Sequence, residues 1–169
     1  MNQETFKISV FVHKDKLFRF ARRILISEDE AFDVVQEILI KLWEKRETLA
    51  NLNNIEAYAM RMVNNECISR LRKFDVRENY KNSVEFNLDV QNDQQELKPM
   101  IINLINQLPE KQRSVMHLKD VEEYEIKEIA EVLSMEENTV RVNLLRARQK
   151  IKEQLEVFFK NEERAINYK

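Results

Sequence analysis

The chain has 169 residues, with 28 Lys and Arg against 30 Asp and Glu, two His, one Cys and no Gly. Tight β-turns and phosphate-binding loops depend on Gly, so its absence argues against hairpin-rich β architectures and excludes Gly-rich nucleotide loops. One Cys and two His are too few for a structural zinc site, and one Cys excludes an internal disulfide framework. We therefore expect no metal, no cofactor and a reducing compartment.

The hydropathy and charge of the chain limit its location and its partners. The longest apolar runs span only a few residues, so we expect no membrane insertion. The N-terminus lacks the basic start and continuous apolar stretch of a signal peptide, which predicts a cytoplasmic protein. A net charge of −2 draws no nucleic acid by itself, so any DNA binding must come from local charge separation.

In the first half of the chain, apolar residues recur at helical spacing. The period covers residues 5–26 and resumes after Ser27, which forms a capping box with Glu30. A polar interval at 47–55 follows. The next helix carries one apolar stripe from 60 to 74. Cys67 lies on this stripe, so we expect it to be a small buried apolar residue.

The second half begins with a change of composition. Residues 75–98 are rich in Asn, Gln, Asp and Glu without a strong period, which predicts a linker. Helical periodicity returns at 99, Pro109 suits the first turn of the next helix, and two more helices are expected near 125–133 and 137–159.

These elements predict an all-α protein with two small helical domains joined by a flexible linker. The domains are expected at 1–74 and 99–159, and the tail 160–169 carries no pattern that can be interpreted. Fully extended, the linker reaches at most ~80 Å. It therefore lets the two domains contact separate targets.

Charge is segregated within the second domain. Residues 110–137 hold nine acidic and four basic residues, whereas 138–152 hold five basic residues and no acid. A short helix, a brief turn and a basic second helix form the helix-turn-helix pattern, whose second helix enters the major groove of DNA. The solvated face of an ordinary C-terminal helix can carry the same basic residues. Charge alone therefore does not distinguish a DNA-binding helix from such a solvated helix.

The first domain has a similar asymmetry. Residues 28–37 hold five acids and no bases, whereas 58–73 hold four bases and one acid, with Asn64 and Asn65 off the apolar stripe. An Asn-containing loop beside a basic helix with flanking aromatic residues suits single-stranded DNA. Alternatively, Tyr58 and Phe74 are core residues and Trp43 caps the helical bundle.

Three motifs occur in order along the chain: DVVQEILIKLW at 33–43, EAYAMRMVNNECISRLRK at 56–73, and a stretch at 108–155 that contains LPEKQR, EIA, TV and RAR. Together they resemble bacterial RNA polymerase sigma factors. The resemblance is strongest to the small extracytoplasmic-function group, which keeps only regions two and four of the larger family members. It implies region two at 1–74 and region four at 99–159.

The resemblance implies three binding surfaces. Polymerase docking would fall on Asp33, Gln36, Glu37, Ile40 and Trp43. Capture and melting of the minus-ten element would fall on Asn51, Asn53, Asn54, Arg61, Asn64, Asn65, Arg70 and Arg72. Reading of the duplex minus-thirty-five element would fall on Asn138, Thr139, Arg141, Asn143, Arg146 and Arg148.

The function implied is promoter recognition and transcription initiation without covalent chemistry. The partners implied are core RNA polymerase, promoter DNA and an anti-sigma factor, and the chain is expected to be a monomer when free. Where family members usually have Gly, this chain has Glu123, Ser134 and Asn138, which puts the turn geometry in question. Val142 and Leu145 replace positions that are often polar, which predicts an unusual promoter preference.

Two other classes of protein compete with this reading. A stand-alone helix-turn-helix regulator predicts a dimer and palindromic sites, but leaves the motifs at 33–43 and 56–73 unexplained. A purely structural helical interaction protein predicts no nucleic-acid binding. An enzyme is less expected than either, because His13 and His117 are isolated, and His117 fits the edge of the core.

Overall fold

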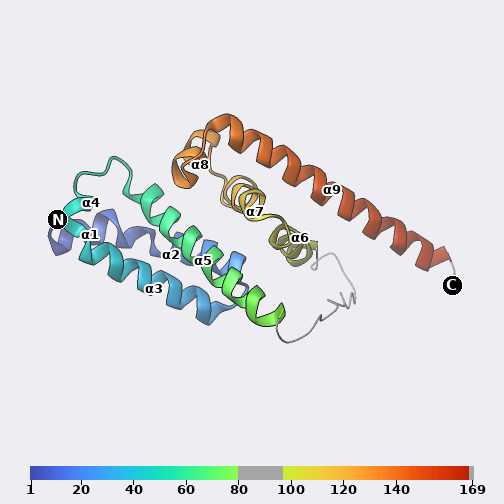
Figure 1. Ribbon diagram of the computed structural model, residues 1–169, viewed down its shortest axis with the longest axis horizontal. Helices are drawn as coiled ribbons and strands as arrows, with labels where there is room; N and C mark the ends of the chain where they lie inside the picture. Colours follow the sequence, from blue (N-terminus) through green and yellow to red (C-terminus); the bar gives the residue numbers. More distant parts are fainter. Residues whose placement is uncertain (80–96, 168–169) are drawn as a thin grey trace. The chain divides into compact units, whose positions relative to one another are not determined.

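The computed structural model describes residues 1–79 and 97–167, and its regular elements there are helices (Figure 1). In the first half they are α1 Gln3–Ser9, η1 Phe11–His13, α2 Lys14–Leu25, α3 Glu28–Glu44, α4 Arg46–Leu49 and α5 Ile55–Asn79. In the second half they are α6 Leu97–Asn106, α7 Glu110–Met116, η2 His117–Val121, α8 Ile126–Leu133 and α9 Glu137–Asn167. The all-α prediction is confirmed. Most of the expected linker, residues 80–96, lies outside the described residues.

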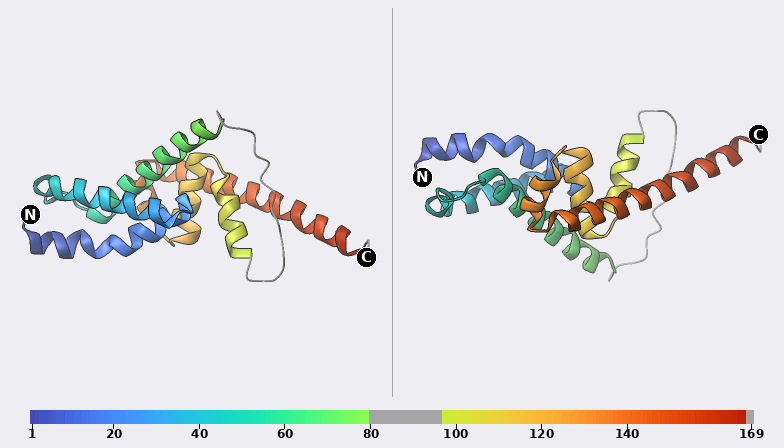
Figure 2. Two further views of the ribbon diagram at one scale, coloured as in Figure 1. Left: turned by 90° about the horizontal axis from the view of Figure 1, so that it is seen from below. Right: turned by 90° about the horizontal axis from the view of Figure 1, so that it is seen from above.

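The chain divides into two compact units, the first containing α1 to α5. In it α2, α3 and α5 pack against one another as a three-helix bundle (Figures 1 and 2). The Ser27 side chain accepts a hydrogen bond from the Glu30 backbone N–H at 3.3 Å, so the predicted N-cap of α3 is present. The periodic stretch 5–26 is interrupted at Val10, where α1 gives way to η1 and α2.

The buried face of α5 is wider than the single stripe read from the sequence. Met60, Val63 and Cys67 are buried as predicted, but Asn64 is also buried, at 5% exposure. Because α5 contacts both α2 and α3, it turns a broad face inward. Burial raises the pKa of the Cys67 thiol to about 12, which makes this side chain an inert core residue.

The apolar stripe of α5 ends earlier than predicted. Phe74 is 61% exposed, so the reading of Phe74 as a core residue is wrong. Arg70 forms an ion pair with Glu30, which is in the first turn of α3. Phe74 is one turn further along α5, so it lies beyond the start of α3. The helix itself continues to Asn79, past the predicted end at 74.

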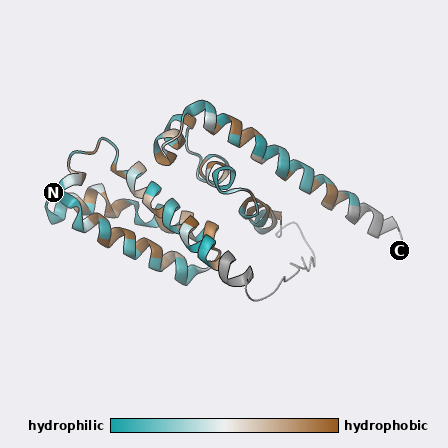
Figure 3. Ribbon diagram, viewed as in Figure 1, coloured by the Kyte–Doolittle hydropathy of each residue, from teal (hydrophilic) through white to brown (hydrophobic). Residues whose placement is uncertain are grey.

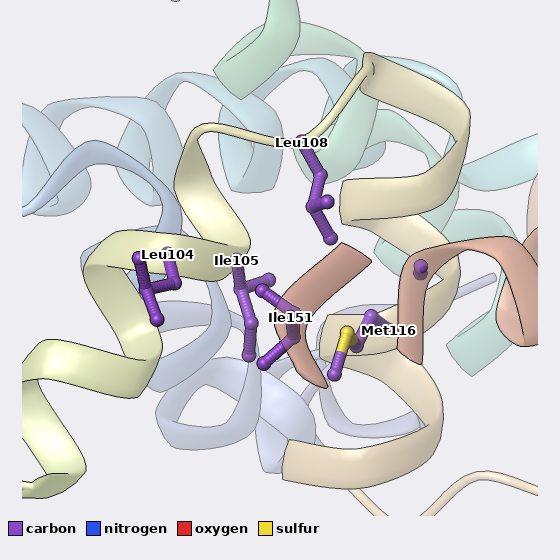
Figure 4. Packing of buried hydrophobic residues seen from close by; sticks show 6 residues of the cluster. Leu104, Ile105, Leu108, Met116 and Ile151 are labelled. Carbon is purple, nitrogen blue, oxygen red and sulfur yellow. The ribbon is translucent and has the colours of Figure 1, made fainter. Parts of the chain in front are cut away.

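The second unit contains α6, α7, α9 and the first part of α8. Its core cluster joins α6, α7 and α9 (Figure 4) through Leu104, Ile105, Leu108, Met116, Ala147 and Ile151. The inward face of α9 buries Val140, Leu144, Ala147 and Ile151, and hydrophobic and hydrophilic residues alternate along this helix (Figure 3). The helix reaches Asn167 and therefore includes most of the expected tail.

His117 lies in the interior of this unit rather than at its edge. The side chain is fully buried in η2, and its Nε2 lies 2.8 Å from Oδ1 of Asn106. A polar ring can be buried here because the amide supplies a hydrogen-bond partner. Pro109 precedes α7 as its N-cap, one residue before the predicted position in the first turn.

Among the described residues, three adopt left-handed backbone conformations that usually favour Gly: Ile26 (φ 64°), Glu123 (φ 62°) and Ser134 (φ 52°). Two of them, Glu123 and Ser134, are positions where the family resemblance anticipated Gly. Ser134 ends α8 by allowing the Met135 N–H to donate to the Ala130 carbonyl at 2.9 Å. Asn138, in contrast, lies within the first turn of α9.

Candidate nucleic-acid interface

One side of α3 carries all of the residues expected to bind polymerase. Asp33, Gln36, Glu37, Ile40 and Trp43 are each exposed and recur every three to four residues, so they share one helix face. Ile40 is 58% exposed. The face therefore combines two carboxylates and an amide with uncovered apolar surface, which suits a protein partner bearing basic and apolar groups.

Trp43 packs against the bundle and also keeps part of its surface exposed. Its ring meets Phe6 edge-on with centroids 5.0 Å apart, which anchors α1 to the bundle. The other side remains 37% exposed beneath the Arg46 guanidinium, 4.7 Å from the ring. It also borders a pocket of about 280 Å³, whose other lining residues are Gln3, Phe6, Lys7 and Phe11.

The Asn-containing segment between α4 and α5 places its side chains unequally. Asn51 and Asn53 are exposed. Asn54 caps α5, because its Oδ1 accepts a hydrogen bond from the Ala57 N–H at 2.9 Å. Of the three amides, Asn51 and Asn53 are therefore the exposed ones, and Asn54 is half-buried.

Along α5, the expected DNA-binding residues do not share one environment. Asn65 and Arg72 are exposed, Arg61 is half-buried, and the Oδ1 of buried Asn64 has no hydrogen-bond partner within the described residues. Arg70 is only 19% exposed in its side chain. The sequence placed all of these residues in one set, but their accessibility separates them.

Arg70 joins α5 to α3 through an ion-pair network. Its Nη1 donates to Glu30 Oε2 at 2.6 Å and its Nη2 donates to Glu37 Oε1 at 2.7 Å. Its Nε lies 3.5 Å from Glu66 Oε1. Burial opposes the charge of Arg70, but the hydrogen bonds and charges of Glu30 and Glu37 prevail and raise its pKa above the ordinary value.

In the second half of the chain, α8, a short turn and α9 form the predicted helix-turn-helix. Asn138, Thr139, Arg141 and Arg146 are exposed on the first turns of α9. Arg141 Nη2 donates to Glu137 Oε2 at 2.8 Å, an exposed pair that costs little to break. The half-buried Asn143 donates from Nδ2 to the Thr139 carbonyl at 2.8 Å.

Arg148 is turned toward η2. Its Nε donates to Asp120 Oδ2 at 3.0 Å, while Nη2 donates to Oδ1 of the same carboxylate. This bidentate hydrogen bond raises the pKa of Arg148. Neither Asp120 nor Glu30 was anticipated as a partner from the sequence, because the paired residues lie on separate elements and no local spacing links them.

Other features of the described residues narrow the chemistry. No cluster of three or more His, Cys, Asp or Glu side chains there could hold a metal ion. In the same part of the chain, no helix combines the length and apolar character needed to cross a membrane.

Two family models match this chain. Residues 12–76 match Sigma-70 region 2, and residues 99–151 match Sigma-70, region 4. The ECF RNA polymerase sigma factor SigW of Bacillus subtilis (strain 168) is 26% identical over 169 residues, covering 91% of this chain and 90% of SigW. The RNA polymerase sigma-E factor of Streptomyces coelicolor is 28% identical over 151 residues, covering 89% and 85%.

Solved structures share the fold. RpoE from Bartonella quintana, crystallised with the anti-sigma factor NepR, superposes with a TM-score of 0.68 at 23% identity, covering 91% of this chain and 98% of RpoE. CnrH, in complex with the cytosolic domain of CnrY, gives a TM-score of 0.68 at 22% identity, covering 92% and 90%.

The chain therefore belongs to the sigma-70 family. Within that family it is an RNA polymerase sigma factor of the extracytoplasmic-function group. The family is non-enzymatic, in agreement with the sequence prediction, and its region four carries the DNA-binding helix-turn-helix.

Proposed function

We propose that this sigma factor divides its work among three surfaces. The exposed face of α3 binds core polymerase. The segment 48–55 and the basic side of α5 capture the melted minus-ten element. The first turns of α9 read the duplex minus-thirty-five element. The supporting observation is the segregation of charge among these three segments. Residues 28–37 of α3 hold five acids and no base, whereas 58–73 of α5 hold four bases and one acid, and 138–152 of α9 hold five bases and no acid.

The physical reason is electrostatic. An acidic helix repels phosphate and attracts a basic protein surface, whereas a basic helix neutralises phosphate and releases counterions. A net charge of −2 hides this arrangement, since opposite charges on separate surfaces cancel only in the sum. We expect weak DNA binding by the free chain, with polymerase supplying the missing contacts.

Two of the arginines expected to contact the minus-ten and minus-thirty-five elements are assigned a different role here, which is to position helices. Arg70 is engaged by carboxylates of α3, and Arg148 is engaged by Asp120. Their guanidinium groups hold helices in place. The exposed residues Asn51, Asn53 and Asn65 then form the minus-ten surface together with Arg61 and Arg72.

We assign residues 1–74 to region two and residues 99–159 to region four. Residues 75–98 connect the two regions as a tether, and residues 160–169 form a tail. The chain acts in the cytoplasm as a monomer until it joins polymerase. An anti-sigma factor is its expected regulator. This expectation is supported by the relatives RpoE and CnrH, which share the fold and were solved in complexes with the anti-sigma factor NepR and with CnrY.

Reconstituted transcription tests this function. DNA selected from a randomised duplex pool by the chain bound to core polymerase should contain two conserved elements. Core polymerase with the chain should initiate transcription from that DNA, and core polymerase alone should not. Initiation that is independent of the chain, or a single palindromic site bound by a dimer without polymerase, would overturn the proposal in favour of a stand-alone regulator.

A further inference from the structure

The exposed face of α9 has an apolar centre. Leu145 is 71% exposed and Val142 is 38% exposed. The two residues are three positions apart, so they are neighbours on one helix face. The core residues Val140, Leu144 and Ala147 occupy the opposite side, so neither Val142 nor Leu145 is part of the buried core of region four.

This apolar pair is framed by positive charge. Arg141 lies one turn before Leu145, and Arg146 lies one turn after Val142. The four side chains form a patch with two cations around two apolar groups, and no acid occurs between 138 and 152. Such a surface fits a polyanion that also offers small apolar groups.

Duplex DNA has this chemistry in its major groove. The phosphates flank the groove, and its floor carries one apolar group, the C5 methyl of thymine. A recognition helix enters the major groove with its first turns toward the base edges, so a helix α9 docked in this way presents Val142 and Leu145 to that floor. Guanine and adenine edges are polar, so an exposed Leu gains little from them.

We propose that Val142 and Leu145 read thymine methyl groups in the upstream promoter element. This inference rests on the proposed role of α9, and it names the specificity that α9 imposes. Arg141 and Arg146 supply the phosphate or guanine contacts at the edges of the patch. The Arg141–Glu137 pair does not prevent this, because both side chains are about half exposed and exposed ion pairs exchange readily for phosphate.

Substitution of deoxyuridine for thymidine tests the methyl contact directly. The substitution removes one methyl group and leaves base pairing and the groove hydrogen bonds unchanged. Each thymine of the selected upstream element is replaced in turn, on either strand, and the affinity of the chain–polymerase complex for the duplex is measured. At one or two positions we expect affinity to fall about three- to fourfold, the loss that follows when one methyl group is no longer there to be buried in the interface.

Protein variants then assign the position. Leu145→Ala should weaken upstream binding and abolish the deoxyuridine effect at one position, and Val142→Ala should do so at the same or a neighbouring one. Both side chains are exposed, so the variants should fold and keep their affinity for core polymerase. Val157→Ala, a 60% exposed valine beyond the patch on α9, is the matched control and should change neither measurement.

The outcomes separate the inference from the proposed function. If a two-element promoter is found but deoxyuridine is neutral throughout the upstream element, the methyl contact is refuted while the sigma-factor role stands. An equal deoxyuridine effect in wild type, Leu145→Ala and Val142→Ala also refutes it. Loss of polymerase affinity in Leu145→Ala would show that the patch binds protein instead. If no upstream element is selected at all, the proposed role of α9 fails with it.

Discussion

At the scale of single residues, the most unusual property is the construction of helix ends without Gly. Left-handed backbone costs an L-residue about 1–2 kcal/mol, and Ile26, Glu123 and Ser134 each bear that cost. The strained conformations persist because the backbone hydrogen bonds at these helix ends depend on them. Glu123 precedes α8 and Ser134 follows it. The two residues therefore determine the backbone direction where the chain enters the helix-turn-helix and at its turn.

Replacing Ser134 with Gly should therefore stabilise region four. Gly removes the backbone strain of the folded state. This gain in free energy exceeds the cost of the extra conformational entropy that Gly gives the unfolded chain, which is about 0.4–1 kcal/mol. We expect a net gain of roughly 0.5–1 kcal/mol, measured by denaturant unfolding of the full chain. Gln149→Gly, in the helical backbone of α9, is the control and should destabilise by about 1 kcal/mol. A loss of stability in Ser134→Gly would contradict the left-handed assignment.

At the scale of elements, the α3–α5 pair is held by a charged network as well as by its core. Arg70 spans Glu30 and Glu37, which are two turns apart on α3. Glu37 also belongs to the face that we assign to polymerase. Arg70 thus fixes the carboxylate that the partner meets, and a planar fork is needed to hold two carboxylates at once.

Arg70→Lys should weaken binding to core polymerase by roughly tenfold, about 1.4 kcal/mol, because a lysine is a point charge without the fork. Arg70→Gln should do the same, and neither change should alter the salt dependence of promoter binding. Arg72→Gln is the contrasting variant, which should lower the slope of log K against log salt by about one while sparing polymerase affinity. The opposite pattern, in which Arg70→Gln reduces the salt slope and keeps polymerase affinity, would make Arg70 a phosphate contact.

The sequence predicted the elements better than their ends. Long periodic stretches specified α3, α5, α8 and α9, because burial of one helix face leaves a clear period. The ends were not predicted: the first periodic stretch is interrupted at Val10, and α5 and α9 continue past 74 and 159. An apolar period shows that a helix exists, but it does not fix the residue at which the helix ends.

The candidate site was predictable to a similar degree. Motifs placed the docking residues on α3, and the structure finds them exposed on one face. The sequence could not separate Arg70 and Arg148 from exposed arginines, since their partners lie on other elements. It also could not show that Asn64 is buried while its neighbour Asn65 is exposed, because that depends on the breadth of the α5 interface.

At the scale of the whole molecule, near-neutrality results from two strong and opposite surfaces. The acids of α3 and the bases of α9 belong to different compact units, so each unit can engage its own partner. A repressor needs only the basic surface. A protein that connects an enzyme to a promoter needs both, and their effects should be separable by mutation.

That separation is the most direct test of the account. The chain with Asp33→Ala and Gln36→Ala, and the chain with Arg141→Ala and Arg146→Ala, are each compared with wild type for core polymerase affinity and for protection of the upstream element by the assembled complex. We predict that the α3 pair loses polymerase affinity, and that the α9 pair keeps it but leaves the upstream element unprotected. If both pairs impair the same step, the assignment of separate surfaces is wrong.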